Sequence, residues 1–420
     1  MKIFIIGSGP SGLICSNILQ NLSESCEDLE YEILTTDVDG FKKVSTKENL
    51  DYQIGQRTFF HDDSLKSFLE DIVGVKPVME TLSDKIGVYF RKNIHKYPFQ
   101  NNLGELKLRE KISLYLSYYF RNKSLSDASN FADWVVGNYG EWLGKNIILP
   151  HTWKTIKEDL WMISSESYGQ KVIPLGKKDK VSYHYSNASE IYNCLKDNVK
   201  DHVTLAKVTN IDIKNSRVHF MKGDEACNVR YDYLLNTIAL PKLMRCIHEK
   251  EDILDVASKS LRWNNMFISV MIVPSKFIMY PHKIIYFPER DYIFSKVNIN
   301  RYNGYTSIVS EVSFRRNDED LLRSDAYKNK IMEKIEYDLK KSGLLEENLF
   351  TTFNNYTHFV SPAYIICDGE YSMYNNILQT YLEHQQIYNV GRFSQWLPHM
   401  RVEHSYQRSM ELMKKLGLIK

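Results

Sequence analysis

The chain begins Met1-Lys-Ile-Phe-Ile-Ile-Gly7-Ser8-Gly9-Pro10-Ser11-Gly12, and this stretch decides the fold. An apolar, largely β-branched run ends at Gly7, which predicts a buried parallel strand followed by a tight turn. The residues that follow favour a helix, so the order is strand, glycine turn and helix, as in a dinucleotide site. Gly7 permits the turn, Gly9 lets a pyrophosphate approach bare backbone, and Gly12 lets the helix pack close to its strand.

The first turn of that helix suits an anion. Pro10 fits there because its missing N–H would have had no partner, and Ser11 follows it. The free N–H groups of the turn and the helix dipole attract a diphosphate. We therefore predict that Gly7, Gly9, Pro10, Ser11 and Gly12 contact a dinucleotide. The alternative is a tight turn without a ligand.

The composition is that of an ordinary globular protein, with 420 residues of which 43% are hydrophobic and 25% charged. The length favours two or three lobes. The net charge of +2 demands neither nucleic acid nor an anionic membrane. The six cysteines show no C-x-x-C pair and no zinc-ligand spacing, so we expect free thiols and no metal site; disulfides or a bound metal are the alternative. The apolar run before Gly7 is too short for a signal peptide, no run approaches the ~20 residues of a membrane span, and the expected location is cytoplasmic.

Two further stretches offer candidate ligands. A second strand is predicted from Tyr31 and ends in Asp37, 25 residues after Gly12 and near the spacing of ~20 residues expected for a carboxylate that binds a ribose. The alternative is a solvated turn residue. In the run 51–61, Gly55 interrupts a predicted strand, which indicates close approach of a backbone or ligand. Arg57 beside it is placed to face a phosphate or substrate anion, or else lies on the wet face of a surface strand.

The rest of the chain alternates between helical and strand-like lobes. The pattern predicts a helix over 62–80, a hairpin over 86–99, an aromatic-rich helical lobe over 104–170, strands within 203–208 and 231–237, an antiparallel sheet over 263–313 and a charged helix over 316–342. Near the C-terminus, a strand over 387–393 runs into Gly391 and a helix follows from Glu403 to Leu416. No linker separates these lobes, so we expect them to be interleaved and the C-terminal junction to return to the nucleotide-binding sheet.

Taken together, these segments resemble FAD-dependent proteins of the flavin amine oxidase class, specifically the protoporphyrinogen oxidase-like group that includes UDP-galactopyranose mutase relatives. The segments that carry the resemblance follow the family's order over nearly the whole chain. They are Gly7–Gly12, Ile54–Phe60, Lys96–Gln100, Asn130–Trp134, Asn236–Pro241, Ile285–Pro288 with Glu311–Ser313, and Gly391–Trp396. Three positions depart from the family: Asp37-Val-Asp-Gly40 replaces its acid followed by Gly-Gly, Arg57 replaces a histidine near the flavin, and Arg401–Ser405 replaces Asn-Met-Asp-His-Ser.

The resemblance implies an α/β fold: a Rossmann-like (GR2-type) FAD-binding domain with an interleaved antiparallel-sheet substrate domain and a helical lobe. It divides the chain into five parts. Residues 1–80, 191–260 and 381–420 are expected to form the FAD-binding domain, 81–190 the substrate and helical lobe, and 261–380 the antiparallel-sheet substrate domain.

The resemblance also implies further contacts with FAD. Gly391 and Arg392 are expected to reach the diphosphate from the side opposite the N-terminal glycines, and the amide of Val402 or Glu403 to approach the flavin pyrimidine edge. The remaining expected cofactor contacts are Asp37 on the ribose, Gly55 and Val208. Arg57 and His61 are expected nearest the reacting face, as catalytic residues; the alternatives for these two are a structural ion pair and a helix N-cap neighbour.

The implied activity is an FAD-dependent oxidoreductase that acts on a small polar metabolite by hydride transfer to flavin N5. The first alternative is a redox-neutral sugar-nucleotide mutase, in which reduced flavin N5 attacks an anomeric carbon and arginines bind the nucleotide diphosphate; Arg91, Arg290 and Arg301 are candidates. The second is a non-catalytic flavin-binding scaffold that binds a partner. The expected partner of an enzyme is a small molecule such as a sugar nucleotide or amine, with no nucleic acid and no membrane span. The oligomeric state is left open.

Overall fold

The N-terminal strand is the centre of a parallel sheet. In the computed structural model, β1 (Lys2–Ile6) pairs in parallel with β13 (Tyr233–Asn236) on one side and β2 (Glu30–Thr35) on the other. β19 (Ile387–Asn389) pairs with β13, and β9 (Val203–Leu205) with β2, which gives the order β19-β13-β1-β2-β9. The structure describes residues 1–24, 26, 28–37, 59–81, 85–169, 172–173, 175–176, 183–302, 304–346 and 354–419, and only the backbone of 43–45 and 51–53.

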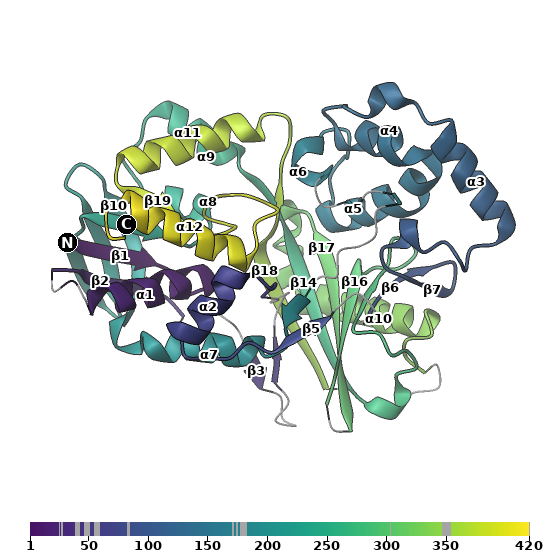
Figure 1. Ribbon diagram of the computed structural model, residues 1–420, viewed down its shortest axis with the longest axis horizontal. Helices are drawn as coiled ribbons and strands as arrows, with labels where there is room; N and C mark the ends of the chain where they lie inside the picture. Colours follow the sequence, from purple (N-terminus) through teal and green to yellow (C-terminus); the bar gives the residue numbers. More distant parts are fainter. Residues whose placement is uncertain are drawn as a thin grey trace.

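Helices cover both faces of this sheet, which is why β1 is buried along four of its five residues. Ile3 and Ile5 share a core with α1 (Pro10–Ser23), α7 (Ala188–Asn198) and α12 (Val402–Lys415). On the opposite face, Phe4 and Ile6 share a core with α8 (Leu240–Arg245), α9 (Asp252–Ser260) and α11 (Tyr371–His384). Figure 1 shows the two helical layers on either side of the strands.

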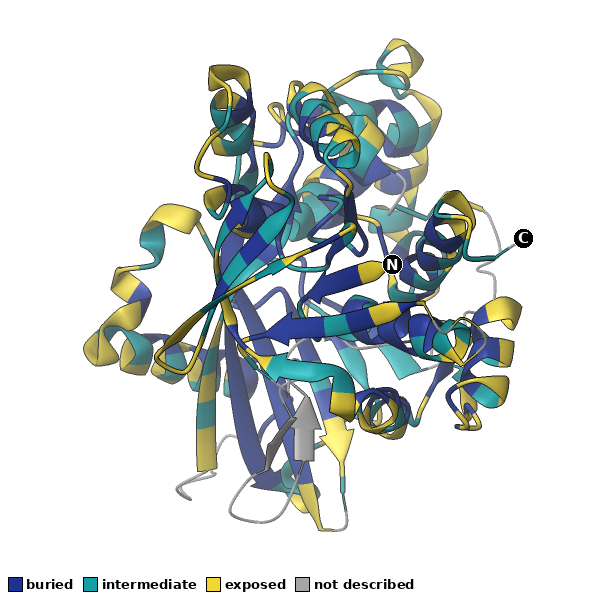
Figure 2. Ribbon diagram, turned by 90° about the vertical axis from the view of Figure 1, so that its left-hand side faces the viewer, coloured by how far each residue is buried: buried dark blue, intermediate teal, exposed yellow. Residues whose placement is uncertain are grey.

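A seven-stranded sheet forms the second body of the molecule, in the order β18-β14-β17-β16-β15-β6-β7. Its long antiparallel strands are β14 (Arg262–Pro274), β17 (Tyr305–Phe314) and β18 (Asn354–Ile366), followed by β16 (Lys296–Arg301) and β15 (Ile284–Tyr286). The hairpin of β6 (Ile86–Phe90) and β7 (Asn93–Lys96) joins through a parallel β6–β15 pair. Helix α10 (Asp325–Lys341) packs on this sheet through Ile335 and Leu339. In Figure 2 the strands at the centre are buried along most of their length.

A helical lobe lies beside the second sheet. It contains α3 (Leu108–Tyr119), α4 (Phe131–Leu143), the π-helical turn η4 (Gly144–Ile148), α5 (Leu149–Ile156) and α6 (Ser165–Gly169). Lys154 of α5 attaches the lobe to the sheet, because its buried Nζ donates to the carbonyls of Phe287 at 2.8 Å and Glu289 at 2.9 Å. Burial lowers the pKa of Lys154 to about 7, with a further contribution from Lys157.

Three small sheets complete the fold. The three-stranded antiparallel one has β10 (Lys207–Asp212), β11 (Arg217–Lys222) and β12 (Glu225–Arg230). The two-stranded ones pair β5 (Met79–Thr81) with β8 (Tyr183–Tyr185), and β3 (Lys43–Ser45) with β4 (Asp51–Gln53). Within the described residues, no helix has the length and apolarity needed to cross a bilayer. All six cysteines lie among the described residues and are free thiols.

The helix predicted over 62–80 is wrong in its second half. Helix α2 spans only Asp63–Asp71, because Gly74 adopts a positive φ of 76° that turns the chain toward β5. The run 203–208 also divides: the chain leaves the parallel sheet after β9 and enters the small antiparallel sheet at β10. The hairpin over 86–99 and the helix near 403–416 are confirmed, the latter as α12.

Candidate functional site

The turn between β1 and α1 is built so closely that two of its glycines cannot carry a side chain. Gly7 has a φ of 104°, and a Cβ there would lie 2.8 Å from Thr237 Oγ1. A Cβ on Gly12 would lie 2.1 Å from the carbonyl oxygen of Gly7. Thr237 follows β13 and donates its hydroxyl to the carbonyl of Ile6 at 2.8 Å. The helix therefore starts directly against the ends of two neighbouring strands.

Gly9 differs from its two neighbours. It has an ordinary φ of −68°, and a Cβ placed on it would meet no described atom within 4 Å. It is the N-cap of α1, and no side chain of the described residues caps that helix end. Neither backbone strain nor packing requires glycine here. The bare backbone leaves open space beside the unpaired N–H groups of the first turn.

The C-terminal glycine junction lies against the N-terminal one. Gly391 has a φ of 109°, and a Cβ there would lie 2.4 Å from Ser11 Oγ. Ser11 Oγ donates to Ser405 Oγ at 3.0 Å, across 394 residues of sequence. One turn further along, Cys15 Sγ lies 3.1 Å from Ser409 Oγ in a buried hydrogen bond between α1 and α12. The structure thus brings the two glycine corners together, and we call this region the glycine corner (Gly7–Gly12 with Gly391–Arg392).

Arg392 brings a positive charge to the glycine corner without an acidic partner among the described residues. Its Nε is buried and makes no hydrogen bond to a described atom. Its guanidinium carbon lies 5.2 Å from the ring centre of Phe393 and 5.9 Å from that of Tyr364. Burial lowers the pKa of Arg392. A partly buried cation whose Nε has no hydrogen-bond partner among the described residues is costly unless an anion pairs with it, so it points to an anionic ligand.

The end of β2 is held beside the same corner. Ser8 Oγ donates to the carbonyl of Asp37 at 2.6 Å, and Thr35 Oγ1 donates to it at 3.0 Å. The N–H of Ala206 donates to the carbonyl of Thr35 at 2.7 Å, which places the start of β10, and with it the partly buried Val208, near this strand end. Asp37 and Val208 therefore approach the carboxyl edge of the parallel sheet, where ligands of open α/β sheets bind.

The start of α12 supplies the other predicted cofactor contacts. Val402 is the first residue of the helix, and Glu403 beside it is only 6% exposed. Glu403 Oε2 is buried without a hydrogen bond to any described residue, and Oε1 lies 3.6 Å from the guanidinium of Arg401. Burial raises the pKa of the Glu403 carboxyl.

The structure describes one of the two residues expected to be catalytic, His61. The other, Arg57, lies outside the described residues, as does the expected cofactor contact Gly55. His61 precedes α2, with Nδ1 3.1 Å from the hydroxyl of Tyr185 and Nε2 3.3 Å from Asp63. These contacts connect His61 to β8 and α2, and it is not among the residues that line the cavity described next. Its catalytic role stays a prediction.

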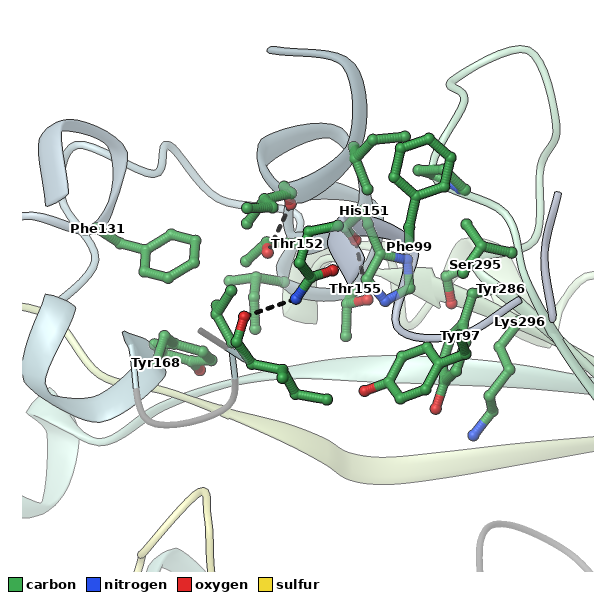
Figure 3. Close-up of a pocket in the computed structure, with 18 of the residues that line it drawn as sticks. Tyr97, Phe99, Phe131, His151, Thr152, Thr155, Tyr168, Tyr286, Ser295 and Lys296 are labelled. Carbon is green, nitrogen blue, oxygen red and sulfur yellow. Dashed lines mark hydrogen bonds between the residues drawn. The ribbon is translucent and has the colours of Figure 1, made fainter. Parts of the chain in front are cut away.

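A cavity of about 320 Å³ lies between the helical lobe and the seven-stranded sheet (Figure 3). Most of its lining is apolar or aromatic. Several lining residues belong to the segments that carried the family resemblance, namely Tyr97, Phe99, Gln100, Phe131, Tyr286 and Pro288. Tyr364 of β18 lines the cavity as well and also faces the guanidinium of Arg392, so the cavity adjoins the glycine corner.

The polar groups of the cavity are mostly neutral or paired. His151 of α5 has a buried Nδ1 without a hydrogen-bond partner among the described residues, and its ring meets that of Tyr286 edge-on at 5.3 Å. Burial lowers the pKa of His151 to about 3, with Lys154 and Lys296 adding to the effect, so the imidazole is neutral at pH 7. Lys296 forms a buried ion pair with Glu311 at 2.9 Å. Burial alone would lower the pKa of Lys296, but the charge and hydrogen bond of Glu311, together with Tyr364 and Tyr286, outweigh it and raise that pKa.

The three arginines considered for a diphosphate do not meet in this cavity. Arg91 and Arg290 line a separate hollow of about 740 Å³ on the other face of α5, where the guanidinium of Arg290 lies 4.5 Å from the Trp153 ring centre. Arg301 is bound to loop carbonyls, including those of Pro281 and His282 at 3.4 Å. The structure therefore does not assemble these arginines into one clamp.

Four residues of the site were not singled out from the sequence: Thr237, His151, Lys296 and Tyr364. Thr237 had a usable signal, because it ends a predicted strand that pairs beside the first one. His151 and Lys296 had none, since their neighbours in the cavity come from distant segments.

No protein-family model and no curated protein matches the sequence. Solved structures do match. Reduced UDP-galactopyranose mutase superposes with a TM-score of 0.84 at 18% identity, over 100% of this chain and 94% of that chain. This is the fold of UDP-galactopyranose mutase.

Two further structures share the fold. A protein from Exiguobacterium sp. 255-15, provisionally named a protoporphyrinogen oxidase, gives a TM-score of 0.72 at 14% identity over 99% of each chain. Cyclohexylamine oxidase from Brevibacterium oxydans IH-35A gives 0.67 at 11% identity over 99% of each chain. The fold class predicted from the sequence, including its interleaved lobes, is confirmed.

Proposed function

We propose that this chain is an FAD-dependent oxidoreductase. The observation that carries the proposal is the glycine corner, in which Gly9 leaves open space beside an uncapped helix end and Arg392 presents a partly buried guanidinium without an acidic partner among the described residues. Both features fit a diphosphate, which offers negative charge and acceptor oxygens to N–H groups and a guanidinium. The residues present therefore fit the cofactor.

The proposal assigns roles to the parts of the chain. Residues 1–80, 191–260 and 381–420 contribute all five strands of the parallel sheet and bind the cofactor. Residues 81–190 and 261–380 contribute the helical lobe and the seven-stranded sheet, which enclose the substrate. Gly7, Gly9, Pro10, Ser11, Gly12, Gly391 and Arg392 hold the diphosphate, Asp37 the ribose, and Val402 and Glu403 the flavin; Val208 lies beside the nucleoside end.

The cavity favours a particular kind of substrate. When bound, the flavin supplies hydride acceptance, and the protein contributes binding, orientation and exclusion of water. The aromatic lining excludes water and contacts an apolar body. His151 lines the cavity, and its neutral imidazole carries one hydrogen-bond donor and one acceptor. We infer a substrate with an apolar body and one polar group, such as an amine, in place of the small polar metabolite expected from the sequence.

A sugar-nucleotide mutase is the second candidate. The fold match to UDP-galactopyranose mutase favours it. Against it, among the described residues the cavity presents no arginine, and its lysine is already paired with Glu311. A nucleotide diphosphate needs cations that are free to pair with it.

One set of measurements separates these functions. The isolated protein is expected to show flavin absorbance, and the flavin is expected to bleach anaerobically with one member of a panel of alkyl and aryl amines. Turnover of a UDP-sugar that depends on prior dithionite reduction, without bleaching by any amine, would instead assign the mutase. A protein that contains flavin but responds to neither panel would assign the scaffold function. A colourless protein that does not take up FAD would overturn the proposal as a whole.

A further inference from the structure

The second hollow of the helical lobe lies on the side of α5 that is turned away from the cavity. Helical spacing puts Leu149, Pro150 and Trp153 on this side, whereas His151 and Thr152 face the cavity. The hollow has a volume of about 740 Å³, and its other walls come from the segments that follow α5, β15 and β17. We call it the outer hollow.

Three cations gather around Trp153 at this hollow. The guanidinium carbon of Arg290 lies 4.5 Å from the indole ring centre, and Nζ of Lys157 lies 4.6 Å from it. Arg315 joins them, because its Nε donates to the carbonyl of Lys157 at 3.1 Å. Burial lowers the pKa of Lys157, and the charges of Arg290 and Arg315 lower it further, with Asp318 offsetting them in part. The three positive charges therefore repel one another.

These three cations are held without being neutralised. Within the part of the chain that the structure describes, none of them forms an ion pair with a carboxylate. The other basic residues of the hollow differ, since Arg91 is paired with Glu110, and Lys145 with Glu141 at 2.6 Å. An indole attracts a cation through its ring face and accepts none of its hydrogen bonds. The cations around Trp153 therefore keep N–H donors for a further partner.

The acidic residues of the outer hollow contact other groups. Asp159 Oδ1 accepts from the backbone N–H of Trp161 at 3.0 Å, and Glu289 Oε2 accepts from that of Arg91 at 3.2 Å. Burial raises the pKa of the Glu289 carboxyl. Asp291 is exposed, so water and salt screen its charge. The hollow thus offers donors from its cations and an acceptor beside Trp161.

We propose that the outer hollow binds a nucleoside monophosphate, with the phosphate against the three cations and the base on Trp161. A phosphate offers acceptor oxygens to several N–H donors, and its charge relieves the repulsion among Arg290, Lys157 and Arg315. Trp161 lines the hollow and is 64% exposed, so its indole ring is available for a flat base to stack. The Asp159 carboxylate beside it accepts from a ribose hydroxyl.

The size and the place of the hollow fit such a ligand. Its volume of about 740 Å³ lies within the range of roughly 300–1,000 Å³ that is usual for small-molecule sites. None of the described residues that line it belongs to the glycine corner or to the lining of the cavity. The site is therefore separate from the proposed positions of the cofactor and the substrate, and it does not depend on the proposed function.

Isothermal titration calorimetry of the protein as isolated tests the site, with AMP, glycerol 3-phosphate and adenosine as probes. We expect AMP to bind with a dissociation constant below about 100 μM. Glycerol 3-phosphate lacks the base and should bind about 10-fold more weakly. Adenosine lacks the phosphate and should bind about 100-fold more weakly.

Four variants locate the binding. Arg290→Met and Arg315→Met should each weaken AMP binding at least about 10-fold, because each removes a charge-assisted contact. Trp161→Ala should weaken AMP binding about 10-fold and leave glycerol 3-phosphate binding unchanged, a split that a purely structural role would not produce. Arg230→Met is the matched control, because Arg230 is likewise exposed and has no ion pair in the described ranges, but lies on β12. Its AMP affinity, and the circular dichroism of all four variants, should match the wild type.

Three outcomes would overturn the proposal. The first is AMP that does not bind at about 1 mM, or that binds equally to the wild type, Arg290→Met and Arg315→Met. The second is AMP binding that is lost in Arg392→Met and kept in Arg290→Met, which would assign the ligand to the glycine corner. The third is equal affinity of the wild type for AMP and glycerol 3-phosphate, which would exclude a contact with the base.

Discussion

The glycine corner and the cavity lie next to each other, yet they are built in opposite ways. At the corner the chain is packed so closely that three glycines have no room for a Cβ: Gly12 faces the carbonyl of Gly7, whereas Gly7 and Gly391 face the side chains of Thr237 and Ser11. In the cavity, large aromatic side chains from the hairpin, the helical lobe and two further strands meet around about 320 Å³ of space. Among the described residues, the arginine of the corner, Arg392, has no acidic partner, whereas the lysine of the cavity is paired with Glu311.

The two regions are therefore constrained differently. The shape of the ligand constrains the backbone of the corner, whereas the identity of the ligand constrains the side chains of the cavity. A diphosphate imposes the same backbone geometry wherever it binds, so few residue types are tolerated. A cavity wall of side chains can change one residue at a time and still enclose a substrate. Four substitutions, in order of decreasing expected effect, test this comparison.

Gly12→Val should have the largest effect, because its Cβ would meet the carbonyl of Gly7. We expect a loss of more than ~3 kcal/mol of unfolding free energy, with loss of flavin. Gly9→Val is the matched partner: its Cβ meets no described atom, so thermal stability of the apo-protein should be unchanged while flavin retention is lost. Thermal melts and flavin absorbance measure both. Equal flavin content in Gly9→Val and wild type would contradict the placement of the diphosphate.

Arg392→Met should weaken flavin binding about 100-fold, or roughly 2.7 kcal/mol, because a charge-assisted contact to the diphosphate is removed. The apo-protein should be as stable as the wild type or more so, since a partly buried guanidinium with no described acidic partner is replaced by an apolar chain. Flavin titration and apo-protein melting measure the two effects. Arg323→Met, at an exposed arginine, is the control and should change neither. A destabilised apo-protein with normal flavin affinity would show that Arg392 has a structural role only.

His151 should make the protein less stable in acid. Its pKa is about 3 in the folded protein against an ordinary value of 6.5, so below pH 6.5 the unfolded chain binds a proton that the folded chain does not. The stability that this neutral histidine provides is present above pH 6.5 and is lost as pH falls, by about 2 kcal/mol at pH 5.

The measurement is the change in unfolding free energy between pH 7 and pH 5. It should be about 2 kcal/mol smaller in His151→Gln than in the wild type. Thr152→Val, at the neighbouring cavity residue, does not titrate and should behave as the wild type. The same pH dependence in His151→Gln and wild type would place the acid sensitivity elsewhere.

His61→Ala should have the smallest effect. Its hydrogen bond to Tyr185 contributes about 1 kcal/mol of stability, the contact with the exposed Asp63 adds little, and turnover should stay within about twofold of the wild type. Thermal melting and the rate of flavin reduction measure the two. A large loss of turnover at unchanged stability would support the catalytic role predicted from the sequence.

The sequence predicted the corner better than the cavity for a physical reason. The positive φ at Gly7 and Gly391 favours glycine, and this appears locally in the sequence as a glycine after an apolar strand. Both junctions could therefore be found without knowing which residues pack against them. The parallel pairing of β15 with β6 has no local signal, and it is this pairing that brings Tyr97 and Tyr286 to one wall. Helix α2 was overextended because Ile72 and Val73 continue the helical spacing, while the turn at Gly74 depends on the strand that follows.

The contact of Ser11 with Gly391 and Ser405 has a consequence for how the protein is made. During synthesis the first glycine turn emerges from the ribosome early, yet the residues that close it emerge hundreds of codons later. Until then the edge of β13 that pairs with β19 has no partner. If the chain binds FAD as proposed, cofactor capture is a step that follows translation, and a prematurely terminated product lacking the last thirty or so residues should stay colourless even when its earlier lobes have folded.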